Sequence, residues 1–324
     1  MLDTNLWSYL GDDASVPAFD RLLDERDLRL VVAPSTLLEV FDIPHEDVRH
    51  RIITGMATGP RRTRLHTEAE SYATEVVNLV RRYRPEWMLQ VPNPALAARH
   101  QNFWLKKVWS EALENSARHH RYQQGQKPTH NHIMGRQRFQ RTQMLETKFN
   151  LPDLTEMMAA ADDHALDQLP GWDGSPAALW RLQLGQLSWY HLGVIGARAR
   201  MTGEDRTMTD WVEPYVDLRK VRRDPDGFSA IWLDQACIED VPRNWLSWAV
   251  EVVQWTQKVG SGNPADAQHA AYLLDCDVFL SADKRYVAAL ERVRSDAPFE
   301  FATTRLISAD PSTPVATRIA AALE

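Results

Sequence analysis

The two ends of this chain alternate between strand-like and helix-like segments, and this alternation constrains the fold more than any other feature. Residues 28–33, Leu-Arg-Leu-Val-Val-Ala, form a strand-like run, and residues 15–25 place their apolar side chains on one helical face. Near the other end, residues 277–281 predict a strand and residues 284–293 predict a helix. Strands that alternate with helices favour a parallel sheet covered on both faces. We therefore expect an α/β fold.

The middle of the chain has a different character, because its periodic segments are helical. Five of its segments show helical spacing of apolar residues: 66–84, 95–122, 134–149, 153–169 and 176–201. Residues 123–132 are polar and predict a loop. The simplest architecture is a parallel-sheet α/β core made of residues 1–45 and 245–324. An all-helical insertion, residues 46–244, interrupts this core and would serve substrate recognition or partner binding.

Composition favours an ordinary globular protein that works without a membrane. Of the 324 residues, 44% are hydrophobic and 25% are charged. The two cysteines, Cys237 and Cys276, are too few for a disulfide framework. The N-terminal residues lack the basic-then-apolar pattern of a signal peptide, and no apolar run approaches the roughly 20 residues that a membrane-spanning helix needs. These features predict a cytoplasmic location.

Four carboxylates lie where helices are expected to begin beside strands. They are Asp3, Glu39, Asp266 and Asp283. Because strand-to-helix junctions share one edge of a parallel sheet, we expect the four side chains to converge there. Converging carboxylates repel one another unless cations neutralise them. Carboxylate oxygens suit hard divalent cations, so the sequence predicts an oxygen-only site for Mg²⁺ or Mn²⁺.

Helix capping offers a separate explanation for each of the four acids. Glu39 and Asp266 each follow a Thr or Asn by three residues, which is the spacing of a capping box. Asp3 and Asp283 directly precede predicted helices, where an acid can cap the first turn. Capping does not require that the four acids meet at one place. Their arrangement in space therefore distinguishes the two explanations.

Small polar residues beside two of the acids support the predicted site. They are Thr4, Asn5 and Ser281, and their side chains can hydrogen-bond a carboxylate ligand. His269 lies three residues after one of the acids, and we interpret it as a partly buried histidine with its own hydrogen-bond partners. The sequence contains no phosphate-binding loop, no serine-hydrolase elbow and no His-Glu-x-x-His zinc motif.

Positive charge is concentrated in one part of the chain. Residues 45–150 contain 18 Lys and Arg against 9 Asp and Glu, whereas the whole chain has a net charge of −7. This asymmetry predicts a basic surface for an anionic partner. The arginines proposed for it are Arg61, Arg62, Arg64, Arg81, Arg82, Arg136, Arg138 and Arg141. Interleaved Tyr and Phe suit phosphate contact combined with base stacking, although ordinary solvated helix faces carry similar residues.

The segments around the four acids resemble the PIN-domain nucleases. The resemblance rests on Leu2-Asp3-Thr4-Asn5, Glu39, Asp266 and the run Phe279-Leu280-Ser281-Ala282-Asp283-Lys284-Arg285-Tyr286. In that family the matching acids bind Mg²⁺ or Mn²⁺ and cleave RNA. The resemblance implies a PIN-like core and a metal-dependent endoribonuclease, a hydrolase in which the four acids hold one or two cations. It also implies products with 5′-phosphate and 3′-hydroxyl ends.

Two other functions stay open at this point. One is a toxin or defence effector nuclease, acting on RNA or DNA, that an inhibitory or regulatory protein partner controls. The other is a catalytically inactive PIN-like RNA-binding scaffold, although that class usually lacks the acids and all four are present here. DNA stays open as a substrate because phosphate contacts do not distinguish it from RNA.

Overall fold

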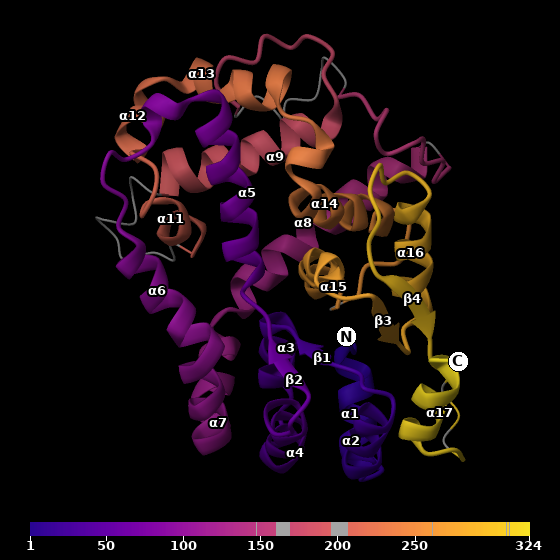
Figure 1. Ribbon diagram of the computed structural model, residues 1–324. Coiled ribbons are helices and arrows are strands. Elements are labelled where there is room, and N and C mark those ends of the chain that lie inside the picture. The colour runs from indigo at the N-terminus through magenta and orange to yellow at the C-terminus, as the bar shows by residue number, and fades with distance from the viewer. Residues whose placement is uncertain (147, 160–168, 196–206, 261, 309, 311) are drawn as a thin grey trace.

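The computed structural model describes residues 1–146, 148–159, 169–195, 207–260, 262–308, 310 and 312–324 (Figure 1). In these residues the chain is mostly helical, and its strands form two small sheets of two parallel strands each. Parallel strands joined through helices confirm the α/β character that the sequence predicts. None of the described helices is long and apolar enough to cross a membrane.

Short strands interrupt the series of helices near both ends of the chain. The first part of the chain contains α1 (Thr4–Asp12), α2 (Val16–Glu25), β1 (Leu30–Val32), α3 (Pro34–Asp42), α4 (Glu46–Ala57), β2 (Arg62–Arg64), α5 (Glu68–Tyr83), α6 (Pro94–Asn102), a π-helix (Phe103–Lys107), α7 (Val108–Gly125) and α8 (Lys127–Glu146). The second part contains α9 (Leu179–Trp189), α11 (Thr207–Val212), α12 (Leu218–Arg223), α13 (Pro225–Ala230), α14 (Pro242–Gln254), α15 (Asn263–Ala270), β3 (Val278–Ser281), α16 (Lys284–Arg294), β4 (Thr303–Leu306) and α17 (Val315–Ala322).

The strands pair across large distances in the sequence. β1 pairs with β2, with Leu30 opposite Arg62, and β3 pairs with β4, with Val278 opposite Thr303. Leu2 adds a parallel bridge to β3, where the Asp3 N–H donates to the Leu280 carbonyl oxygen at 2.9 Å. The beginning of the chain is therefore fixed against a strand near its end.

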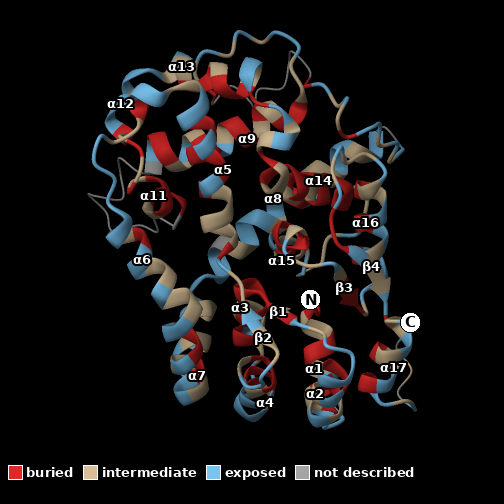
Figure 2. Ribbon diagram, viewed as in Figure 1, coloured by how far each residue is buried: buried red, intermediate tan, exposed pale blue. Residues whose placement is uncertain are grey.

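These strands lie between two hydrophobic cores. Successive strand residues point to opposite faces, so Phe279 belongs to one core and Leu280 to the other. Val32 and Ala33 divide in the same way. One core contains residues of α1, α2, α4 and α17, and the other contains residues of α5, α14 and α16. Figure 2 colours the chain by burial, with buried residues in red. The acids that follow the strands are thereby held where the two cores meet.

The structure corrects three sequence-based expectations. β2 lies inside residues 46–244, which were predicted to be all-helical, and it pairs with β1. The loop predicted over 123–132 is wrong, because α7 runs to Gly125 and α8 begins at Lys127. The helix predicted over 153–169 does not form over 153–159. Residues 160–168 of that predicted helix lie outside the described residues. The same is true of residues 196–201 of the helix predicted over 176–201. The predicted domain boundaries stay a prediction.

Candidate metal centre

Asp3 is fixed in place by the elements on both sides of it. Its backbone pairs with β3, and its side chain caps α1 by accepting from the Thr4 N–H at 2.7 Å. The second carboxylate oxygen accepts from Asn5 Nδ2 at 2.8 Å and from the Ser281 hydroxyl. Asp3 is buried, with 6% exposure. The predicted supporting residues Asn5 and Ser281 therefore orient this carboxylate.

Glu39 was expected at a strand-to-helix junction, and the structure places it elsewhere. It lies inside α3, and the cap residue of that helix, Ala33, makes no side-chain capping bond. Glu39 Oε2 instead accepts a hydrogen bond from the Thr4 hydroxyl. Burial raises the pKa of Glu39, and the charge of Asp3 raises it further, against the opposing effect of His269. The capping-box explanation is therefore wrong for Glu39.

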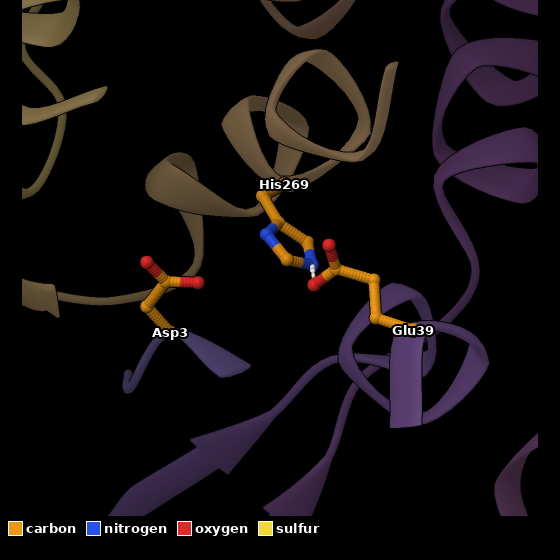
Figure 3. A group of neighbouring side chains, drawn as sticks. All are labelled: Asp3, Glu39 and His269. Atoms are coloured by element: carbon orange, nitrogen blue, oxygen red, sulfur yellow. Dashed lines mark ion pairs between the residues drawn. The ribbon is translucent and has the colours of Figure 1, made fainter. Parts of the chain in front are cut away.

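His269 forms a cluster with Asp3 and Glu39 that was not predicted from the sequence. Its ring lies between the carboxyl groups of Asp3 and Glu39 in the view of Figure 3, and its Nε2 is 3.4 Å from Glu39 Oε2. One ligand atom from each of the three residues lies within 4.8 Å of the others. His269 is 1% exposed, and neither ring nitrogen has a hydrogen-bond partner among the described residues. Its interpretation as a satisfied, partly buried histidine is wrong.

Asp266 lies one helical turn before His269 on α15. It makes no capping bond, because its Oδ2 accepts from Gln254 Nε2 at 2.8 Å. Burial raises the pKa of Asp266 to about 9, with further contributions from the charges of Asp3, Glu39 and Asp283. The capping explanation fails here too. Asp266 therefore lies close enough to the other three acids for their charges to act on it, while the group within 4.8 Å contains Asp3 and Glu39 with His269.

Asp283 has the most exposed position of the four. It caps α16 by accepting from the backbone N–H groups of Arg285 at 2.7 Å and Tyr286 at 3.1 Å. The capping explanation holds for this residue. Its charge still acts on Asp266, so Asp283 contributes to the negative potential at the edge of the cluster.

The donor set fits a divalent cation. In the described part of the chain no Lys or Arg forms an ion pair with any of the four acids, and Glu39 pairs only with His269. The ring nitrogens of His269 are a second sign, because neither makes a hydrogen bond with the described residues, whereas buried polar atoms are normally hydrogen-bonded. Asp3, Glu39 and His269 would hold the ion. The oxygen-only site stays a prediction, and an imidazole among the ligands would favour Mn²⁺ or a later transition metal over Mg²⁺.

The raised pKa of Asp266 predicts how the stability of the metal-free protein changes with pH. The folded state keeps a proton that the unfolded state releases near pH 3.8, the ordinary pKa of an aspartate side chain. Folded protein thus binds more protons between about pH 4 and pH 9, and stability falls as pH rises through this window. Melting temperatures measured in chelator should fall less steeply with pH in Asp266→Asn. The exposed Asp234→Asn is the control, and equal slopes in all three proteins would contradict the prediction.

Three of the eight predicted RNA-binding arginines are held by contacts within the protein. The side chain of Arg62 is 3% exposed, lies 2.8 Å from Asp20 and donates to the Gly55 carbonyl oxygen at 2.6 Å. Arg64 donates to the Leu105 carbonyl oxygen, and Arg141 donates to that of Thr256. For Arg62, whose guanidinium is buried, the prediction of RNA contact is wrong.

The other five arginines are closer to solvent. Arg61 pairs with Asp24 and Asp27, and Arg82 pairs with Asp240. Arg81 makes only a local bond to Asn78 on α5. The exposed arginines of α8, Arg136 and Arg138, donate no side-chain hydrogen bond within the described residues. Of the predicted set, these two have the guanidinium groups with the fewest internal partners.

Arg62 should matter for stability. We expect Arg62→Gln to lower the free energy of unfolding by about 2 kcal/mol, because it leaves a buried carbonyl and Asp20 without a charged donor. Arg81→Gln, with the same loss of charge at an exposed site, should change stability by less than about 0.5 kcal/mol. Urea unfolding of both variants measures this. Equal stabilities would show that the Arg62 contacts contribute nothing.

Comparison with known proteins does not identify a relative. No protein-family model, no curated protein and no solved structure matches the chain.

Proposed function

We propose that this chain is a metal-dependent endoribonuclease with a PIN-like core. The proposal depends above all on one observation: three distant segments of the chain bring ligand atoms of Asp3, Glu39 and His269 within 4.8 Å of one another. Helix capping does not explain Glu39 or Asp266. A divalent cation there would supply Lewis-acid activation of water and of a phosphodiester, which is the chemistry of phosphate-cleaving metal sites.

The residues around the centre have distinct tasks in this proposal. Ser281 and Asn5 orient the Asp3 carboxylate, and Thr4 orients Glu39. Gln254, which is 3% exposed, holds Asp266 at 2.8 Å. Residues that hydrogen-bond to metal ligands hold those ligands in position, and they thereby affect both the affinity for the metal and the activity of the site. Burial raises the pKa of Asp266 to about 9, so this group is expected to release a proton when a cation binds.

The choice of RNA follows the resemblance to PIN-domain nucleases and the positive charge of residues 45–150. Purified protein should be incubated with Mn²⁺ and end-labelled single-stranded RNA, duplex RNA or single-stranded DNA. We expect cleavage of RNA to 5′-phosphate and 3′-hydroxyl ends, which ligation-based sequencing detects. Cleavage of DNA alone would keep the phosphodiesterase chemistry and reject the ribonuclease. Cleavage of none of the three would reject both, and would favour the scaffold.

A further inference from the structure

Helix α8 lies beside the candidate metal centre. It contacts α15, which carries Asp266 and His269 (Figure 1). Arg141 anchors it through a 2.8 Å bond from Nη1 to the Thr256 carbonyl oxygen. On its other flank, Arg136 is close enough to Glu251 of α14 to interact with its charge. Because α14 also supplies the side chain that holds Asp266, α8 belongs to the surroundings of the centre.

One face of α8 carries residues of a kind that bind unpaired nucleotides. His132, Arg136, Phe139 and Gln143 are spaced by four, three and four positions, so they follow one another along one face. All four are exposed, and the Phe139 ring is 60% exposed. Gln137, on the packed face, is 2% exposed. We call the four exposed residues the α8 stripe.

The exposed Phe139 side chain is not explained by packing. The Phe139 ring contacts no other ring in the described part of the chain, whereas the rings of Phe41 and Phe279 pair with aromatic neighbours. α8 contains four Lys and Arg against one Glu, which gives it a net charge of +3. An exposed ring beside a guanidinium, on a positively charged helix, complements a polyanion whose bases are open to stacking.

We propose that the α8 stripe binds single-stranded RNA and leads it to the metal centre. Phe139 stacks on a base, Arg136 binds a phosphate, and His132 and Gln143 hydrogen-bond base edges or sugars. Single strands fit because their bases are free to stack, whereas duplex bases are already stacked on one another. The identity of the ligand as RNA rests on the proposed function, while the location and the single-strand preference rest on the stripe itself.

The test measures binding without cleavage. Fluorescence anisotropy of a labelled oligouridine in EDTA reports affinity while divalent cations are absent. We expect Phe139→Leu to weaken binding about tenfold, as loss of one base–ring stack does. Arg136→Gln should weaken it and should reduce the salt-dependence slope by about 0.7, the value for one phosphate contact on a single strand.

Two variants on another flank of α8 are matched controls. Lys127→Gln removes one positive charge at an exposed position of α8, and Leu145→Ala removes an apolar side chain at a residue that is 53% exposed. Both should bind RNA within about twofold of the wild type, since neither residue lies on the stripe. Circular dichroism and melting temperature check that all four variants are folded, which we expect because the changed side chains are exposed.

Several outcomes would overturn the proposal. One is wild-type affinity in Phe139→Leu; another is an equal loss in the controls, which would indicate only general charge or folding effects. Competition by duplex RNA as strong as that by single strands would reject the stacking mode. If RNA binding is unchanged but the wild type forms a dimer that Phe139→Leu loses in size-exclusion chromatography, the stripe is a protein interface. Phe139-dependent binding without any cleavage would support the stripe and reject only the proposed nuclease.

Discussion

Replacing Asp266 with asparagine is expected to lower the rate of RNA cleavage by about a hundredfold to a thousandfold, because charge stabilisation is usually the largest catalytic effect. Asparagine keeps the shape of the side chain and can still accept the hydrogen bond from Gln254. The variant should therefore fold normally. Single-turnover cleavage of labelled RNA, with circular dichroism as the folding check, measures the effect.

The control for this variant is Asp234→Asn, the same change at an exposed acid away from the cluster. It should cleave RNA at the wild-type rate. If Asp266→Asn also cleaves at that rate, the raised pKa of Asp266 reflects burial alone and the residue has no part in the chemistry.

Removal of divalent metal should reduce cleavage to the background rate, and added Mn²⁺ should restore it more fully than Mg²⁺. The preference follows from His269, because a nitrogen ligand suits transition metals better than it suits Mg²⁺. Replacing His269 with glutamine, which offers an oxygen ligand, should narrow the difference between the two metals. Rates measured over a series of metal concentrations, starting from EDTA-treated protein, test this. Full cleavage in EDTA would contradict the mechanism, and an unchanged preference in His269→Gln would remove His269 from the ligand set.

The regular parts of the fold were predictable because they depend on local sequence. The helix predicted over 284–293 and the strand predicted over 277–281 agree with α16 and β3 to within one residue. β2 was missed because Arg62-Thr63-Arg64 has no apolar pattern, and its strand conformation comes from pairing with β1. α8 was missed at its beginning because residues 127–132 are polar, and polarity alone does not separate a solvated helix from a loop.

The site was predictable in its acids but not in its geometry. Strand-to-helix junctions correctly indicated Asp3 and Asp283, whereas Glu39 reaches the cluster from inside α3. A signal for His269 was present, because a spacing of three puts it on the same side of a helix as Asp266. Its burial could not be read from the sequence, since it depends on α3 and α14 packing against α15.

The arginines show the same limit. A basic cluster in a sequence does not reveal which guanidinium groups have partners within the fold. Arg62 Cζ lies 5.8 Å from the ring centre of Trp7, and Arg64 Cζ lies 5.1 Å from the ring centre of Trp109. Both tryptophans belong to helices that are distant from these arginines in the sequence. Only the tertiary structure separates these residues from Arg136 on the exposed face of α8.

The central claim, that the acids form a metal site, is tested most directly by crystals of the protein soaked in Mn²⁺. Anomalous scattering then locates the ion independently of any catalytic assay. The account predicts a peak bounded by the side chains of Asp3, Glu39 and His269, with Asp266 beside it, and a weaker peak in Asp266→Asn crystals. Well-ordered crystals with no peak among these residues, at a Mn²⁺ concentration that supports cleavage in solution, would contradict it.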